Sequence, residues 1–274
     1  MKTKLNNKLL YVSNLSWEHK DFNHVIKLIK KYGYNGIDIA PLQVTNTWKK
    51  IEKKIYTLSD KLKKNNIEVN AIQGIFFKTN FHLFKDFTTE FDKIKKHIIL
   101  NLEICKILNS NKIIIGSSSF RRRNKLSNDI ADKIFVEFFK KLDGILNKKK
   151  IYLCIETIPH QYDEDYIFDI NHLLMLIKKI NSKWVKVNFD TSIYHFNKFD
   201  KNIFLKNLKY IKNIQITEKK FKYLIRPSAK NIKFSCLIKK NKKINKVSLE
   251  ILSKNTNLRK LENSLVSFKK LINI

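Results

Sequence analysis

The sequence lacks the features of a membrane protein and of a disulfide-linked secreted protein. It contains no run of 18 apolar residues, which excludes a membrane-spanning helix. The basic N-terminus has only a short apolar stretch and no small-residue cleavage site, so we expect no signal peptide. Cys105, Cys154 and Cys236 are far apart and lie within apolar segments. Their odd number and wide spacing indicate reduced, buried thiols in a cytoplasmic protein, rather than disulfides or a zinc knuckle.

Glycine-rich loops and linkers are also missing. Without a Gly-rich phosphate or dinucleotide loop, we predict no nicotinamide or nucleotide cofactor. No low-complexity segment or shift in composition marks a boundary within the chain. We therefore predict that residues 1–274 form one domain, a length that α/β barrels often reach.

Acidic residues are scarce, because 24 Asp and Glu stand against 56 Lys and Arg and give a net charge of +32. Such an excess suits proteins that neutralise the phosphates of nucleic acids. Here only five of the basic residues are arginine, and the lysines occur as KK and KKK groups along expected helix faces. We interpret the charge as solvated helix surface, combined with the AT-rich coding that abundant Asn, Ile and Lys suggest. A nucleic-acid partner is a disfavoured alternative interpretation of the charge. Binding of an anionic small molecule or of a membrane surface is another alternative, and of these we expect no membrane partner.

Short apolar runs at fairly even intervals predict β-strands, and segments with apolar residues at helical spacing separate most of them. Strands that alternate with helices indicate βαβ units and a parallel sheet. Eight such units that close on themselves form a (β/α)8 TIM barrel of the α/β class, which we predict here. The expected strands are Leu9–Asn14, Gly36–Ala40, Val69–Gly74, Lys112–Gly116, Tyr152–Glu156, Val185–Asp190, Asn213–Ile216 and Val247–Glu250. The expected helices are Phe22–Tyr32, Phe91–Leu108, Asp132–Leu146, Ile170–Ile180, Ile203–Ile211 and Asn257–Ile274.

Functional side chains of TIM barrels gather at the carboxyl ends of the strands. In the stretch IYLCIETIP the apolar run leads directly into Glu156, and burying an unpaired carboxylate costs several kcal/mol. Other strands carry Asp190, Gln215 and Glu250 near the same end. Three carboxylates and an amide oxygen at one barrel mouth would suit Mn²⁺ or Mg²⁺ better than zinc or copper. Salt bridges of the glutamates with lysines, an N-cap role for Asp190 and a hydrogen-bonding role for Gln215 are the structural alternatives.

Several motifs then occur in a fixed order, beginning with SNLSWEHKDFNHVIKLIKKYGYNGIDIAP at Ser13–Pro41. The others are NAIQGIFF at Asn70–Phe77, IIIGSSSFR at Ile113–Arg121, CIETIP at Cys154–Pro159, FDTS at Phe189–Ser192, NIQITE at Asn213–Glu218 and VSLEIL at Val247–Leu252. With this order and spacing, the chain resembles the sugar phosphate isomerase/epimerase family of the xylose isomerase-like TIM barrels. The resemblance spans almost the whole chain and does not specify a substrate.

The resemblance implies a divalent metal held by Glu156, Asp190, Gln215 and Glu250. Glutamine stands where the family usually has histidine, and an amide oxygen still ligates a hard cation. Two further departures are Ile158, where an asparagine is frequent, and the sequence Asp190-Thr-Ser-Ile, where DxxH is frequent. These departures leave open an alternative in which the barrel binds a sugar or a partner without catalysis.

The resemblance also implies a mechanism. The metal polarises a carbonyl group of the substrate, and Glu156 and Glu250 act as acid and base on the adjacent carbon through an enediolate. The substrate class is a sugar or sugar phosphate, and family members of this type are often homodimers or homotetramers. A dehydratase is a close chemical variant. An apurinic endonuclease-like protein is less favoured, because none of the seven histidines lies at a strand end as a ligand should.

Five further residues are candidates for substrate binding: Trp17, Gln73, Arg121, His160 and Glu218. Arg121 matches a family arginine and is expected to hold a phosphate or carboxylate in a forked contact. Gln73 would bind a hydroxyl group and Trp17 would form an apolar wall. A core position for Trp17, a solvated loop at Arg121 and a surface position for His160 are the alternatives.

Overall fold

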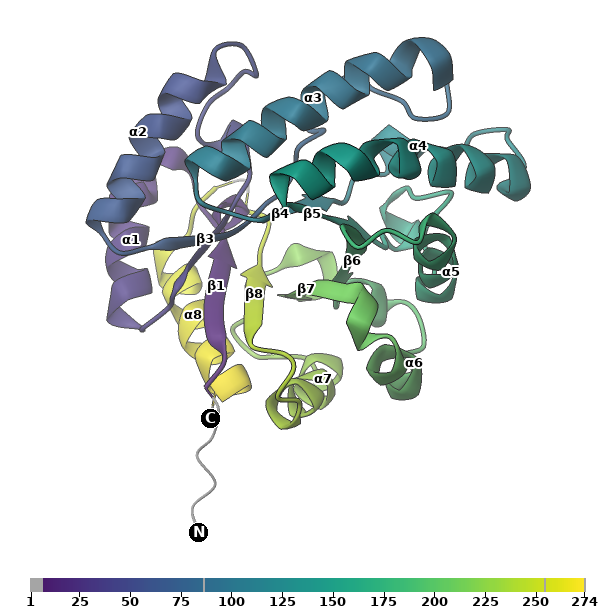
Figure 1. The fold of residues 1–274 in the computed structure, drawn as a ribbon. Helices are drawn as coiled ribbons and strands as arrows, with labels where there is room; N and C mark the ends of the chain where they lie inside the picture. The colour runs from purple at the N-terminus through teal and green to yellow at the C-terminus, as the bar shows by residue number, and fades with distance from the viewer. Residues whose placement is uncertain (1–6, 86, 254, 274) are drawn as a thin grey trace.

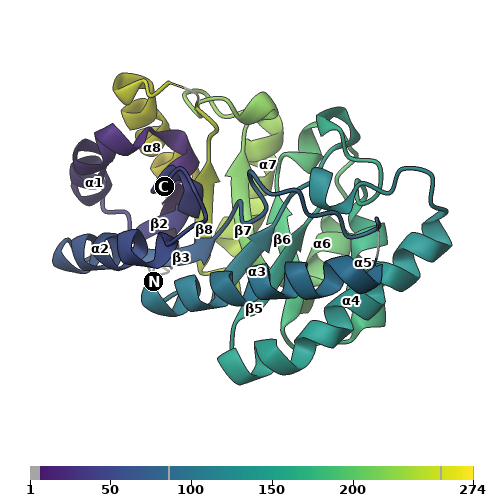
Figure 2. The ribbon, with the colours of Figure 1, turned by 90° about the horizontal axis from the view of Figure 1, so that it is seen from above.

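The computed structural model describes residues 7–85, 87–253 and 255–273. Within this part of the chain, eight strands form one closed barrel in which each strand pairs with its sequence neighbours and β8 returns to β1. All pairings are parallel. The helices lie outside the strands (Figures 1 and 2). The predicted TIM barrel is therefore confirmed.

The elements alternate along the chain as expected. The strands are β1 (Leu9–Ser13), β2 (Gly36–Ile39), β3 (Glu68–Ile72), β4 (Lys112–Ile115), β5 (Tyr152–Glu156), β6 (Val185–Asp190), β7 (Ile211–Thr217) and β8 (Lys246–Glu250). The helices are α1 (Phe22–Lys31), α2 (Ile51–Lys64), α3 (Phe87–Ile107), α4 (Asn128–Lys149), α5 (Ile170–Ile180), α6 (Lys201–Lys206), α7 (Ala229–Lys240) and α8 (Leu258–Asn273). Short 3₁₀ turns occupy Asn14–Ser16, His19–Asp21, Pro41–Gln43, Ser119–Arg121, His160–Tyr162, Ile193–His195, Leu208–Tyr210 and Lys219–Phe221.

Side-chain caps fix where four of the helices begin. Ser127 accepts a hydrogen bond from the backbone N–H of the third residue of α4, and Ser228 does the same for α7. Asp169 and Asp200 each accept from two backbone N–H groups in the first turns of α5 and α6. These caps satisfy donors that lack partners inside the helix, and each contributes about 0.5–2 kcal/mol.

The main hydrophobic core lies between the outer face of the barrel and the helices. Phe189 on β6 belongs to it and packs against Phe204 and Phe234, with ring centroids 4.9 and 5.1 Å away. A second, separate apolar cluster contains Ala71, Ile114 and Cys154. Cys154 shares a strand face with Glu156, so this small cluster lies inside the barrel. TIM barrel interiors are normally filled by bulky branched residues, whereas this interior is mainly polar, as described below.

The helices differ from the sequence-based expectation in three places. Helices α2 and α7 were not among the predicted segments, although α2 buries Ile51, Ile55 and Leu58 at helical spacing. The predicted helix Ile203–Ile211 is shorter, because α6 ends at Lys206 and a 3₁₀ turn follows it.

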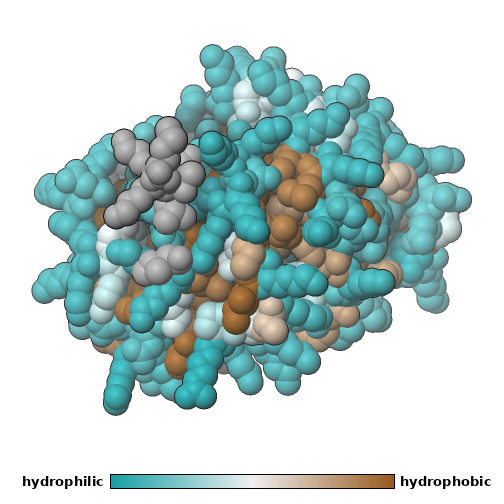
Figure 3. Space-filling view, turned by 90° about the horizontal axis from the view of Figure 1, so that it is seen from below, coloured by the Kyte–Doolittle hydropathy of each residue, from teal (hydrophilic) through white to brown (hydrophobic). Residues whose placement is uncertain are grey.

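The surface carries the excess of lysine. The face seen from below is mostly hydrophilic, with smaller hydrophobic areas between the polar side chains (Figure 3). Among the described residues, no helix has the length and apolar character needed to cross a membrane.

Candidate active site

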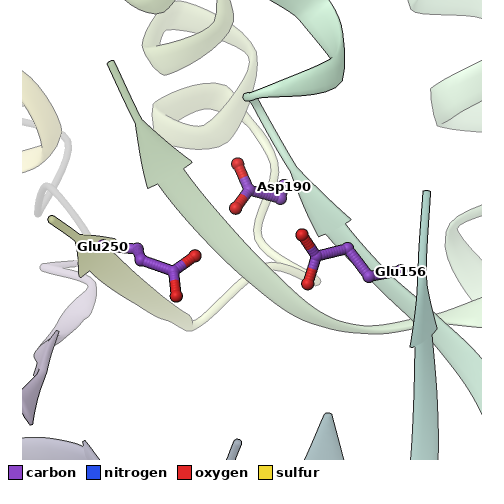
Figure 4. A group of neighbouring side chains, drawn as sticks. All are labelled: Glu156, Asp190 and Glu250. Atoms are coloured by element: carbon purple, nitrogen blue, oxygen red, sulfur yellow. The ribbon is translucent and has the colours of Figure 1, made fainter. Parts of the chain in front are cut away.

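Three carboxylates meet at the carboxyl-terminal end of the barrel. Glu156 ends β5, Asp190 ends β6 and Glu250 ends β8. One ligand atom from each lies within 4.8 Å of the others, and all three side chains are buried. They approach a common point from different sides of the barrel (Figure 4). Because parallel strands end at one edge, residues far apart in the sequence are brought into one cluster.

Burial and mutual repulsion act strongly on this cluster. The pKa of Glu156 is raised to about 8, first because burial disfavours the charged form and then because of the charge on Asp190. The pKa of Glu250 is raised well above its usual value by burial and by both neighbouring carboxylates. Burial also raises the pKa of Asp190, although hydrogen bonds oppose this. A divalent cation would remove the repulsion, and three carboxylate oxygens are the donor set that hard cations prefer.

Asp190 is held in place by the loop and strand beside it. Its Oδ1 accepts from the backbone N–H of Ser192 at 2.6 Å, and its Oδ2 accepts from Thr217 Oγ1 at 2.9 Å. The two contacts use both oxygens and fix the plane of the carboxylate, so Asp190 is oriented before any ligand arrives.

Glu156 fits only because β4 is followed by a glycine. A Cβ atom on Gly116 would lie 2.5 Å from Glu156 Oε2 and 3.1 Å from its Cδ. Real Cβ atoms do not approach other atoms so closely, so any side chain at this position would displace the carboxylate from the cluster.

Three amides link the two glutamates across the barrel; we call Asn188, Gln215 and Gln73 the amide bridge. Asn188 Nδ2 donates to Glu156 Oε2 at 3.0 Å and to Gln215 Oε1 at 2.5 Å. Gln215 Nε2 donates to Gln73 Oε1 at 3.0 Å. Gln73 Nε2 then donates to Glu250 Oε1 and to Ser13 Oγ, both at 2.9 Å. The amide bridge therefore donates hydrogen bonds to the carboxylates of both glutamates, Glu156 and Glu250.

The polar contacts continue from the amide bridge toward the other end of the barrel. Asn188 Oδ1 accepts from Asn213 Nδ2 at 2.9 Å, and Asn213 Oδ1 accepts from Lys112 Nζ at 2.9 Å. Lys112 also donates to Asn70 Oδ1 at 2.5 Å, and Asn70 donates to Asp38 Oδ1 at 2.7 Å. These side chains are all buried, so a hydrogen-bonded network fills much of the barrel interior.

Comparison with known proteins agrees with the fold. The family model described as the xylose isomerase-like TIM barrel matches residues 26–225. The chain belongs to the xylose isomerase-like TIM barrel family. The matched region includes Glu156, Asp190 and Gln215, whereas Glu250 lies beyond it. A search of curated proteins gives no match.

Solved structures with a similar fold superimpose along nearly the full chain. A D-psicose 3-epimerase, solved with D-fructose, has a TM-score of 0.76 at 14% identity, with 97% of this chain and 100% of the other covered. A putative sugar phosphate isomerase/epimerase from Anabaena variabilis has a TM-score of 0.71 at 14% identity, with 96% and 99% covered. An AP endonuclease of family 2 from Brucella melitensis has a TM-score of 0.74 at 14% identity, with 96% and 98% covered. At such identities the likeness establishes the fold alone.

In this xylose isomerase-like barrel, a cavity of about 460 Å³ opens over the carboxylates. Gln73, Glu156, Gln215 and Glu250 contribute to its wall. The predicted substrate-binding residues Trp17, Arg121, His160 and Glu218 are not among the residues that line it. The predicted metal ligand Asp190 is not among them either, although it lies beside Glu156 and Glu250.

The four predicted substrate-binding residues that do not line the cavity have other contacts. Trp17 is buried in the main core, and His160 Nδ1 contacts the backbone oxygen of Glu164 at 2.7 Å. Arg121 is buried, and its Nε and one terminal nitrogen donate to Glu164 Oε2 at 2.9 and 2.7 Å. Glu218 accepts from the backbone N–H of Ser228 at 2.8 Å and from the Asn231 amide at 2.9 Å.

Other polar residues of the site were not predicted. Asn188 and Asn213 each precede a predicted site residue by two positions, and Ser118 and Ser119 line the cavity after β4. The two asparagines had a detectable signal, because residues i and i+2 of a strand point to the same face. The pairs Asn188–Asp190 and Asn213–Gln215 are therefore visible in the sequence as polar residues at alternate positions.

Proposed function

We propose that the protein is a divalent-metal-dependent isomerase or epimerase that acts on a sugar or sugar derivative. The observation that carries the proposal is the buried cluster of Glu156, Asp190 and Glu250, with ligand atoms within 4.8 Å of one another. Such a cluster without a cation is costly, because each buried like charge raises the cost of ionising the next. Family membership and the epimerase among the similar structures support the same reaction class.

The three carboxylates would hold Mn²⁺ or Mg²⁺, with Gln215 as a candidate fourth ligand. A divalent ion at this position supplies Lewis-acid polarisation of a carbonyl oxygen. Gln215 Oε1 already accepts a hydrogen bond from Asn188. A carbonyl oxygen has two lone pairs, so ligation by Gln215 would require it to serve both partners.

Glu156 and Glu250 are proposed as the acid and base. One carboxylate takes the proton from the carbon next to the carbonyl group, which leaves an enediolate, and the other returns a proton to that carbon or its neighbour. The two side chains approach from different strands, so they can address different faces of a bound substrate (Figure 4). The amide bridge donates a hydrogen bond to each glutamate and fixes its position during the transfer.

The first test is Mn²⁺ binding by the purified protein, measured by calorimetry or electron paramagnetic resonance. We expect one ion per chain, and we expect Glu156→Gln and Glu250→Gln each to abolish binding. Glu52 lies exposed in the first turn of α2, so Glu52→Gln is a matched control that should bind like the wild type. Absence of Mn²⁺ binding at millimolar concentration in the wild type would reject the proposal.

Reaction chemistry is tested separately by solvent exchange. Incubation of the Mn²⁺-loaded protein with a panel of ketoses and aldoses in D₂O should place deuterium on the carbon next to the carbonyl group. Metal binding without exchange for any sugar would favour the alternative of a catalytically silent sugar-binding or partner-binding barrel. That alternative rests on the departures at Gln215 and Ile158.

A further inference from the structure

The residue expected to hold a phosphate group is already occupied. Arg121 has no solvent exposure, and its Nε and one terminal nitrogen both donate to Oε2 of Glu164, whose side chain is also fully buried. Glu164 in turn accepts from the backbone N–H groups of Tyr166 and Ile167 at 3.1 and 3.2 Å. Breaking such a pair would leave an uncompensated buried charge. Arg121 Nη1 has no hydrogen-bond partner among the described residues, but Arg121 is buried and does not line the cavity.

The rest of the cavity wall offers little positive charge. Among the described residues that line it, Lys78 is the one basic side chain. Lys78 is exposed to solvent, with its ammonium 5.8 Å from the centroid of the Phe77 ring. Recognition of a phosphate group by a protein usually involves several donors, often with arginine in a forked contact. This cavity lacks that arrangement of side chains despite the net charge of +32 on the whole chain.

Apolar side chains contribute a large part of the wall instead. Phe77 and Leu252 line the cavity and remain 59% and 53% exposed, and Phe221, Ile158 and Leu42 also contribute to the wall. Large apolar side chains exposed within a concave site are characteristic of ligand-binding surfaces. The cavity volume of about 460 Å³ also lies in the range of pockets that enclose drug-sized ligands, larger than a single monosaccharide.

The neutral polar side chains of the cavity wall include several hydroxyl groups. Ser117, Ser118 and Ser119 follow β4 and line the cavity beside Glu156. Hydroxyl side chains both donate and accept, which suits the hydroxyl groups of an uncharged sugar. The cavity wall thus combines the glutamates and neutral hydroxyl and amide groups with apolar side chains.

We propose that the substrate is an uncharged sugar derivative that carries a second, partly apolar group, such as an aryl or glycosyl substituent, rather than a sugar phosphate. The proposal rests on the proposed function and narrows its substrate class. The sugar ring lies over the three carboxylates and contacts the serines. The second group lies against Phe77 and Leu252 and removes their apolar surface from water.

The test compares the binding of three ligands that share one sugar: D-glucose, D-glucose 6-phosphate and phenyl β-D-glucoside. The phenyl glucoside is a binding probe and not a substrate, because its anomeric carbon is an acetal. Calorimetric titration of the Mn²⁺-treated wild-type protein should show the phenyl glucoside binding at least about tenfold more tightly than glucose. The phosphate should give no gain over glucose. Phe77→Ala should remove most of the preference for the phenyl glucoside over glucose.

Tyr56→Ala is the matched control, because Tyr56 is an aromatic residue on α2 that is 58% exposed and does not line the cavity. It should leave all three affinities unchanged. Tighter binding of D-glucose 6-phosphate than of D-glucose would overturn the proposal, and so would equal affinity for the phenyl glucoside and glucose or failure of all three to bind. Mn²⁺ binding is measured without any sugar, and deuterium exchange does not involve the phosphate or the phenyl glucoside, so failure of the proposed function is distinguishable from failure of this proposal.

Discussion

Asn188 Nδ2 lies 3.0 Å from Glu156 Oε2, although Asn188 has no ligand role in the proposed metal site. The same nitrogen donates to Gln215, and the Asn188 oxygen accepts from Asn213. This oxygen contact fixes the orientation of the Asn188 amide, so its N–H groups point toward Glu156. The position of Glu156, a proposed acid/base residue, therefore depends on its hydrogen bond with the Asn188 amide inside the barrel.

We therefore expect Asn188→Leu to weaken Mn²⁺ binding by about 10–100-fold, because residues that orient metal ligands typically have effects of this size. The substitution keeps a similar volume and removes both donated hydrogen bonds. Calorimetric Mn²⁺ titration measures the change. Asn202→Leu, at an exposed position on α6, should leave the affinity as in the wild type. An unchanged affinity in Asn188→Leu would mean that Glu156 holds its position without this contact.

Gln215 and Gln73 are adjacent members of the amide bridge, and comparing them distinguishes ligation from positioning. If Gln215 acts only through the bridge, Gln215→Leu and Gln73→Leu should weaken Mn²⁺ binding to a similar extent, again about 10–100-fold. We expect this result, since Gln215 Oε1 is already hydrogen-bonded to Asn188. A much larger loss in Gln215→Leu than in Gln73→Leu would show that the Gln215 oxygen is itself a ligand.

Gly116 offers a way to disturb the site with one methyl group. In Gly116→Ala the new Cβ would meet Glu156 Oε2 at 2.5 Å, so the carboxylate must move out of the cluster. We expect at least about a tenfold loss of Mn²⁺ affinity with little change in the melting temperature. Gly144→Ala is the control, because a Cβ there meets nothing within 4 Å and Gly144 lies inside α4. It should keep wild-type binding and gain about 0.5–1 kcal/mol of stability.

The ion pair between Arg121 and Glu164 should be a determinant of stability. Arg121→Met leaves the Glu164 carboxylate buried without its partner, which typically costs about 3–5 kcal/mol. Urea unfolding measures this loss, and the double variant Arg121→Met/Glu164→Gln should recover part of it. Arg122→Met removes an exposed pair with Asp163 and should change stability by no more than about 1 kcal/mol. If Arg121→Met were as stable as the wild type, the ion pair with Glu164 would not be a determinant of stability.

Lys112 gives the unfolding free energy a pH dependence with a definite sign. Burial lowers its pKa from 10.5 to about 8, although the charge on Asp38 opposes the shift. Between these two values the unfolded chain binds a proton that the folded protein has released, so the contribution of Lys112 to stability rises with pH. Relative to Lys112→Met, the wild type should gain up to about 3 kcal/mol between pH 7 and pH 10.5. A constant difference between the two proteins in urea unfolding would refute this.

The repeating part of the architecture could be predicted from the sequence. Apolar runs such as Tyr152–Glu156 mark buried parallel strands, and a carboxylate at the end of such a run indicates the functional edge. The same pattern predicted Asp190 and Glu250, which lie beside Glu156 in the structure. Helix α2 was less visible, because lysines at five of its fourteen positions dilute its apolar stripe.

Pairings between distant residues could not be predicted in the same way. Arg121 and Glu164 are 43 residues apart, and Gln73 and Glu250 are 177 apart. Nothing in the local sequence around Arg121 distinguishes a buried arginine from a phosphate-binding one. Its partner becomes known only when the loops after β4 and β5 are placed side by side, and the same holds for the amide bridge.

The polar interior also specifies strand register. Asn188 and Asp190 on β6 point into the barrel, while Phe189 between them packs against Phe204 and Phe234 on the helix side. Sliding β6 by one residue would turn both polar side chains into that aromatic cluster and Phe189 into the hydrogen-bonded network. Misaligned barrels would thus lose buried hydrogen bonds and apolar packing together. The residues that form the site therefore also act against alternative strand alignments during folding.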